Sequence, residues 1–156
     1  MNDERDLEFL AERARELLDR QIGSYRTNHA KATTIIGISA LFVPIFIFVV
    51  ENSNMIIQII AIVPIVLFGC SICFMLKVLS AQKLSQGFNE EQFSRLVNVD
   101  YENILLYEIG AKLDSFKDNQ KIIKKQNDQF ATGLVFTKVA IFLSLSLLLV
   151  GNLFFN

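Results

Sequence analysis

Hydrophobic residues gather into three long blocks along this chain, and between the blocks apolar and polar positions alternate with helical spacing. The blocks cover residues 32–50, 55–76 and 133–153. At a rise of about 1.5 Å per residue, blocks of about 20 residues give helices of roughly 30 Å, the thickness of the hydrocarbon core of a bilayer. The pattern therefore predicts an all-α membrane protein with three transmembrane helices.

Two polar segments outside the blocks also have helical periodicity. Between residues 6 and 25 the apolar residues recur every three or four positions and share one helical face. After residue 100 the steps of three and four are those of a heptad seam, as in a coiled coil, with polar residues at two positions. The predicted oligomer seam comprises Leu106, Ile109, Leu113, Phe116, Gln120, Ile123, Asn127 and Phe130.

No proline separates either segment from the adjacent apolar block, so we expect the transmembrane helices to be continuous with a cytoplasmic helical stalk. Helix is also expected from Lys77 to Gln86, ending at Gly87. Asn89 is the predicted N-cap of a short helix through Val97, and Asp100 is a second candidate cap. The predicted organisation is an amphipathic helix at 1–31, a hairpin at 32–76, a helical segment at 77–130, and a third transmembrane helix with a short outer tail at 131–156.

Basic residues indicate the orientation, because short segments rich in Lys and Arg remain in the cytoplasm. Residues 1–31 carry six Lys or Arg and residues 77–130 carry eight, whereas residues 51–54 carry none. The N-terminus is therefore predicted to be cytoplasmic, and the hairpin and C-terminus are predicted to face outward. Four residues are expected at the level of the lipid headgroups, where cations hold a helix in position: Arg26, His29, Lys31 and Lys138.

Side chains suited to catalysis do not assemble into a recognisable site. The sole histidine, His29, has no nucleophile or second ligand near it in sequence, and the Cys70-x-x-Cys73 pair lies inside an apolar block. We interpret the small residues from Gly69 to Cys73 as a surface for close helix packing. The sequence predicts neither an enzyme nor a bound cofactor or metal. With 15 basic and 16 acidic residues, it offers no basic surface for nucleic acid.

Two features have alternative interpretations. Pro44 and Pro64 each leave a backbone carbonyl four residues earlier without its helical donor. They are either gating hinges or tolerated kinks. Gln120 and Asn127 either specify the register and subunit number of a coiled coil or mark a hydrated stretch of a helical bundle.

The chain resembles the small membrane effectors of bacterial Pycsar-type antiphage systems. The resemblance covers the order of elements, the His29-Ala30-Lys31-Ala32 entry to the first membrane helix, and the long helix that begins YENILLYEIG at residue 101. Histidine stands where the family usually has aspartate. The resemblance implies a homo-oligomeric effector that disrupts the inner membrane during abortive infection, triggered by a cyclic nucleotide or by a soluble defence protein.

Three functions are therefore considered. The first is a membrane-permeabilising effector of antiviral defence. The second is a non-catalytic membrane anchor whose stalk recruits a soluble partner. The third is a constitutive channel or transporter subunit, which the few polar residues of the apolar blocks disfavour.

The predicted orientation can be tested by cysteine labelling in a background without Cys70 and Cys73. Cysteines at Ser53 and Asn156 should react with a membrane-impermeant maleimide in intact cells, because both positions are expected outside. A cysteine at Ser115 should not react in intact cells. Labelling at Ser115 but not at Ser53 would reverse the orientation.

Overall fold

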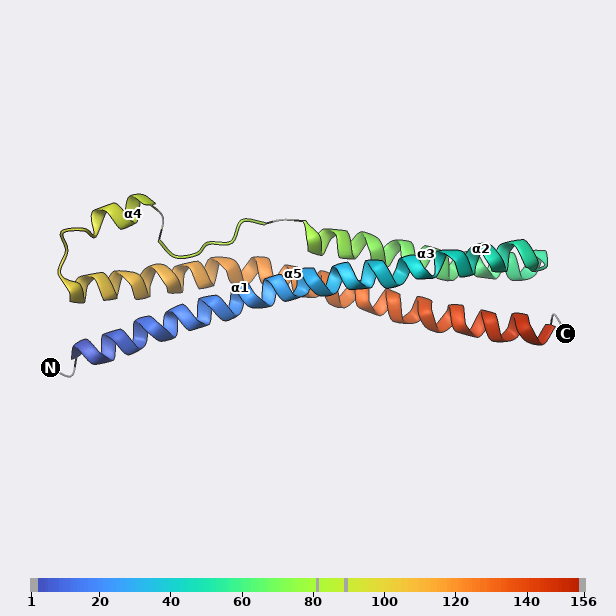
Figure 1. Cartoon of the computed structure of the whole chain (residues 1–156), viewed down its shortest axis with the longest axis horizontal. Coiled ribbons are helices and arrows are strands. Elements are labelled where there is room, and N and C mark those ends of the chain that lie inside the picture. The colour runs from blue at the N-terminus through green and yellow to red at the C-terminus, as the bar shows by residue number, and fades with distance from the viewer. Residues whose placement is uncertain (1–2, 81, 89, 155–156) are drawn as a thin grey trace. The chain divides into compact units, whose positions relative to one another are not determined.

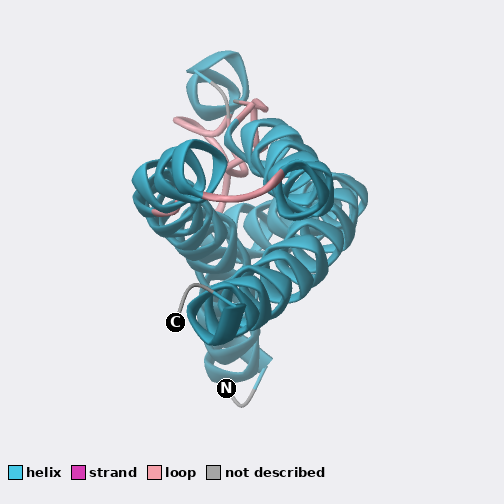
Figure 2. Ribbon diagram, turned by 90° about the vertical axis from the view of Figure 1, so that its right-hand side faces the viewer, coloured by secondary structure: helices cyan, strands magenta, loops and turns pink. Residues whose placement is uncertain are grey.

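A computed structural model of the chain describes residues 3–80, 82–88 and 90–154. Within these ranges every regular element is a helix (Figures 1 and 2). In chain order they are α1 (Asp3–Leu41), α2 (Val43–Asn52), α3 (Met55–Leu79), α4 (Glu90–Arg95) and α5 (Tyr101–Phe154). The prediction of an all-α fold is confirmed.

Three of the described helical segments are long and apolar enough to cross a membrane: Glu4–Glu51, Met55–Leu79 and Tyr101–Leu149. They contain the first two apolar blocks and residues 133–149 of the third. Large apolar side chains on them point away from the protein, including Ile56, Ile62 and Phe142, which are more than half exposed. Such a surface is unfavourable in water and favourable in lipid.

The chain forms two compact units. Unit 1 comprises Met1–Thr27 and Gln82–Lys125, and unit 2 comprises Asn28–Ala81 and Gln126–Asn156. Helices α1 and α5 contribute residues to both units, whereas α2 and α3 belong to unit 2 and α4 to unit 1.

In unit 2 the core consists of three apolar clusters. One joins Ala32 and Ile35 of α1 to Met75 and Val78 of α3. A second contains Phe46, Phe68 and Ala140, and a third contains Val49, Ile57 and Ala61. Alanines with no exposed surface contribute to all three clusters, so helix backbones approach closely at each of them.

The first two apolar blocks form a hairpin, in which α2 lies beside α3 (Figure 1). The side chain of Asn54 accepts a hydrogen bond from the Ile57 amide at 3.1 Å and so caps α3. Gln58 donates to the carbonyls of Val50 and Ser53 at 2.8 and 3.0 Å. These bonds satisfy backbone groups at a turn, where lipid would offer no partner.

The two prolines have different effects on their helices. The first block divides at Phe42, so that α1 ends at Leu41 and Pro44 lies in the first turn of α2. A proline is favourable there because its missing amide has no helical partner at that position. Pro64 lies within an uninterrupted α3 and is almost fully buried.

Unit 1 has a smaller core made by one face of α1 against α5. The buried residues of α1 are Ala11, Ala14 and Leu18, and Leu105 is buried on α5. Gln21 also donates a hydrogen bond to the carbonyl of Phe116 at 3.0 Å. Before α4, Phe88 stacks on Tyr107 of α5 with ring centroids 5.7 Å apart.

The prediction of helix from Lys77 to Gln86 is wrong. Helix α3 ends at Leu79, and residues 82–88, named here the strap, have no regular secondary structure. Side chains of α5 bind the strap backbone, and Gly87 has a φ of 97°, which is incompatible with a right-handed helix. The predicted cap Asn89 lies outside the described residues. Asp100 directly precedes α5, and its carbonyl accepts from the Ile104 amide at 3.0 Å.

Of the predicted small-residue packing surface, Ser71 lies at a close helix contact, whereas Gly69 and Cys73 do not. Ser71 is fully buried, a Cβ atom added at Gly69 would have no neighbour within 4 Å, and Cys73 is exposed. The helix that approaches Ser71 closely is α5, at Gly133. An added Cβ there would lie 2.6 Å from Met75 Cε, 3.0 Å from Phe74 Cβ and 3.4 Å from the Ser71 carbonyl oxygen.

We predict that Gly133→Ala destabilises unit 2 by about 1–3 kcal/mol, because Met75 is fully enclosed and cannot move aside without displacing its neighbours. Thermal unfolding in detergent, followed by circular dichroism, measures the effect. Gly69→Ala is the matched control and should be neutral or slightly stabilising, since alanine is the better helix former. Equal effects of the two substitutions would contradict the packing described for α3 and α5.

Candidate functional site

Polar side chains form buried networks in both units. The described part of the chain has no group of three His, Cys, Asp or Glu placed to hold a metal ion. The networks lie on one row of α5, named here the inner row. Its members are Ser115, Asn119, Gln126, Gly133, Thr137 and Ser144, and the side chains of the five polar ones are less than 5% exposed.

In unit 2 the inner row bonds to α3 through hydroxyl groups. Ser71 Oγ donates to the Gly133 carbonyl oxygen at 2.9 Å and lies 2.5 Å from Thr137 Oγ1. Farther along α5, Ser144 donates to the carbonyl of Ala140 at 2.7 Å. Each hydroxyl thus has a partner inside the chain, as burial among apolar helices requires.

At the first residues of α1 and α5 that belong to unit 2, amide side chains connect three helices. Asn28 Nδ2 of α1 donates to Gln126 Oε1 at 3.2 Å and to Asn127 Oδ1 at 2.5 Å. Gln126 Nε2 in turn donates to the carbonyl of Val78, in the last turn of α3, at 3.4 Å. Asn28 and Gln126 are both buried, so this network sets the relative register of α1, α3 and α5 within unit 2.

In unit 1 the inner row binds the strap. Asn119 Oδ1 accepts from the Ser85 amide and Asn119 Nδ2 donates to the Ser85 carbonyl, both at 2.8 Å. Ser115 Oγ lies 2.7 Å from Ser85 Oγ and accepts from the Gly87 amide at 3.0 Å. One carboxamide therefore satisfies both backbone groups of Ser85, as a neighbouring strand would do in a sheet.

Next to the strap, unit 1 contains a half-buried charge cluster. Glu108 Oε1 accepts from Arg15 Nη2 at 2.8 Å and lies 3.4 Å from Lys112 Nζ. Burial by itself would raise the pKa of the Glu108 carboxyl and is the largest influence on it. The hydrogen bond and charge of Arg15, helped by Lys112, outweigh burial and hold this pKa below its ordinary value of 4.5.

A pocket of about 530 Å³ lies between this charge cluster and α4. Besides the three charged residues, it is lined by Phe88, Phe93, Leu96, Val97 and Ile104. Glu108 is shared by its two cations, so the polar part of the lining is bonded internally, and nothing in the pocket specifies a ligand.

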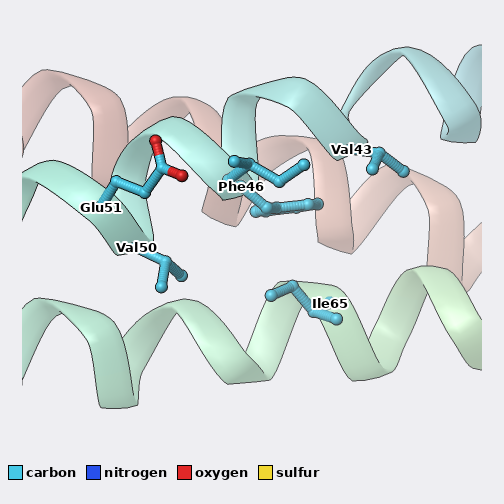
Figure 3. Close-up of a pocket in the computed structure, with 6 residues that line it drawn as sticks. Val43, Phe46, Val50, Glu51 and Ile65 are labelled. Carbon is cyan, nitrogen blue, oxygen red and sulfur yellow. The ribbon is translucent and has the colours of Figure 1, made fainter.

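The hairpin of unit 2 carries an apolar groove of about 370 Å³ between α2 and α3. Val43, Phe46, Ile47 and Val50 line it from α2, and Ile65 lines it from α3 (Figure 3). Glu51 is the one charged residue among the six that line it. A second apolar groove of about 210 Å³ is lined by residues of α3 and α5, Pro64 among them.

The predicted oligomer seam lies mostly outside the core of the single chain. Leu106 and Leu113 are 50% and 40% exposed, and Gln120 and Asn127 are also exposed. Ile109, Phe116 and Phe130 are half-buried, and Ile123 alone is buried. The seam thus remains available to another chain, while Asn127 also accepts the bond from Asn28.

The other predicted residues do not form a common site. Arg26, Lys31 and Lys138 are exposed and His29 is half-buried. An exposed cation at either end of an apolar block agrees with a position at the headgroups. Pro44 and Pro64 lie in different helices: Pro44 is in the first turn of α2, and Pro64 lies within the uninterrupted α3.

The sequence interpretation did not identify the inner row or the strap contacts. A signal for the row was present, because Asn119, Gln126 and Gly133 recur at intervals of seven. They precede positions 120, 127 and 134 by one residue each, and the first two of these positions are the seam residues Gln120 and Asn127.

Comparison with protein-family models, curated proteins and solved structures finds no match for this chain.

The charge cluster yields a prediction with a defined pH dependence. A carboxyl whose pKa is lowered by folding stabilises the folded state above its unfolded pKa, and this contribution is lost as the pH falls through the folded pKa. Glu108→Gln should therefore lower the stability of unit 1 at pH 7 by about 1 kcal/mol, a modest value because Arg15 is 60% exposed. The difference from the parent should shrink once the pH is lowered past 4.5.

Hydrogen exchange of amides in α1 and α5 measures this effect at each pH. Glu16→Gln is the matched control, since Glu16 pairs with Arg13 and Arg20 but is exposed, and it should have a smaller effect at pH 7. A Glu108→Gln effect that persists unchanged at pH 3 would show that the ion pairs are not its cause.

Proposed function

We propose that this protein is a membrane effector of bacterial antiphage defence, which self-associates and permeabilises the inner membrane when triggered. One observation carries the proposal: four hydroxyl groups of the apolar helices are buried, while the outer surfaces of those helices are mainly apolar. Ser39, Ser71, Thr137 and Ser144 are all less than 5% exposed. The chain therefore stores a polar surface inside a bundle whose exterior suits lipid.

A rearrangement of these helices between subunits would turn the stored hydroxyls toward a shared interior. Ser39, Thr137 and Ser144 each donate to a carbonyl of their own helix. These bonds move with the helix, so opening the bundle leaves few polar groups without a partner. A switch of this kind needs two states separated by only a few kcal/mol.

Self-association is supported by the exposed seam on α5. Leu106 and Leu113 are one heptad apart and face away from the chain's own core. A second copy that presents the same residues would cover them. The resemblance noted in the sequence supports the defence context, with a cyclic nucleotide or a soluble defence protein as trigger and with the N-terminus in the cytoplasm.

One observation favours the alternative of a membrane anchor that recruits a soluble partner. Phe93 and Val97 border the pocket of unit 1 and are 65% and 71% exposed. A partner that covers this apolar surface would be bound without any change in the membrane helices.

Expression in a bacterial host, followed with a potential-sensitive dye, tests permeabilisation. The parent should depolarise the membrane under triggering conditions, such as phage infection in the presence of its native gene neighbours. Thr137→Val keeps the side-chain volume but removes a stored hydroxyl, and it should slow depolarisation several-fold. Thr132→Val is the control, because Thr132 is exposed on the same helix and has the same type of carbonyl bond.

The outcomes separate the candidate functions. Protection from phage without any loss of potential would favour the anchor. Unchanged phage sensitivity across a broad panel would remove the role in defence. Depolarisation that is equally fast in Thr137→Val and the parent would show that the stored hydroxyls do not line the path.

A further inference from the structure

The strap is attached to unit 1 by side chains rather than by secondary structure. Its described hydrogen bonds with α5 are the two between Ser85 and Asn119, the pairing of Ser85 with Ser115, and the bond from Gly87 to Ser115. One further bond runs from the Gln82 amide to the Tyr25 hydroxyl at 3.0 Å. All strap bonds to α5 converge on two side chains, so they can be lost together.

Apart from these bonds, the strap is held at one end, where Phe88 stacks on Tyr107 of α5 with ring centroids 5.7 Å apart. Gln82, Lys83 and Gln86 are exposed, and Leu84 is only half-buried. Gly87 requires a positive φ, and an added Cβ there would lie 3.5 Å from Lys112 Cγ, so the strap lies directly against α5. A segment with few buried apolar contacts and a concentrated set of hydrogen bonds opens locally at low cost in free energy.

The strap covers the part of α5 where a polar row and the predicted seam adjoin. Asn119 is 1% exposed and Ser115 is 4% exposed, whereas Gln120, next along the helix, is exposed. While the strap is bound, Ser115 and Asn119 cannot face another chain. Once it is released, both side chains regain free donors and acceptors beside the exposed leucines of the seam.

We infer that the strap is a releasable latch, which keeps the chain unassembled by occupying Ser115 and Asn119 of α5, and that its release allows a second copy to pair with this face. The inference rests on the proposed function and explains how that function is regulated. In the resting state the strap is bound to α5 of the same chain, and a trigger acts by displacing residues 82–88. Polar residues at helix interfaces are well suited to this role because they specify register when paired between chains.

A disulfide can hold the strap closed. The Ser85 and Ser115 hydroxyl oxygens are 2.7 Å apart, so cysteines at both positions are close enough to bridge with little movement. In a background without Cys70 and Cys73, the oxidised Ser85→Cys, Ser115→Cys protein should keep the mass of the unassembled chain under triggering conditions. Reduction with dithiothreitol should restore assembly. Assembly of the fully oxidised protein to the same extent as the reduced protein would overturn the inference.

A substitution within the strap should have the opposite effect, and it leaves Ser115 and Asn119 intact for a second copy. Gly87→Ala forces a positive φ on a residue with a side chain, so the strap should detach more readily and the Ser85 amide of the full-length protein should exchange with deuterium roughly 10-fold faster. The same variant should assemble without a trigger, which mass measurement of detergent-solubilised protein detects. Gly110→Ala is the matched control: a Cβ atom added at Gly110 of α5 would have no neighbour within 4 Å, so both measurements should remain unchanged.

The two measurements separate this inference from the proposed function. Faster strap exchange together with trigger-free assembly supports the latch, whether or not lipid vesicles leak. If the exchange is faster and the mass remains that of one chain, or if the exchange does not change, the latch is wrong. Assembly of Gly87→Ala without dye release from vesicles of bacterial phospholipid would leave the latch standing and overturn permeabilisation.

Discussion

The structure depends on one constraint: polar groups buried between apolar helices must find their partners within the chain, because lipid supplies none. In unit 2, one glycine, Gly133, makes this possible. Gly133 has no side chain, so α3 can approach closely enough for Ser71 to reach both the Gly133 carbonyl and Thr137. The same close approach encloses Met75 completely. Hydrogen bonding and apolar packing of α3 against α5 are therefore two consequences of one missing Cβ atom.

Helix α5 satisfies this constraint differently along its length. In unit 2 its inner row bonds to neighbouring helices through Gln126 and Thr137, and in unit 1 the same row bonds to the non-helical strap through Asn119. An apolar inner face would bury more hydrophobic area but would lack these directional bonds, which fix how the helices pack within each unit.

The helical nature of α5 and its heptad periodicity were predictable from sequence, whereas the face that forms the core was not. Periodicity favours the row with most apolar residues, which includes Leu106 and Leu113, but the chain buries the row that precedes it by one residue, with Leu105 and Asn119. One residue corresponds to a rotation of about 100° around the helix. The buried row consists largely of small residues and hydrogen-bonded polar residues, because these allow close contact between helices of the chain. For the strap, local propensity allowed helix up to Gly87, and the side chains of α5 selected the extended conformation instead.

The sequence by itself determined that this protein has three long apolar helices, where they begin and end to within a few residues, and which ends carry positive charge. These are local properties, since apolar length, periodicity and charge are read from neighbouring positions. Only the tertiary structure decided which row of α5 is buried and that the strap binds Asn119. Both outcomes depend on partners remote in the chain, whose contacts outweigh local preferences because they supply hydrogen bonds and close packing that neighbouring residues cannot.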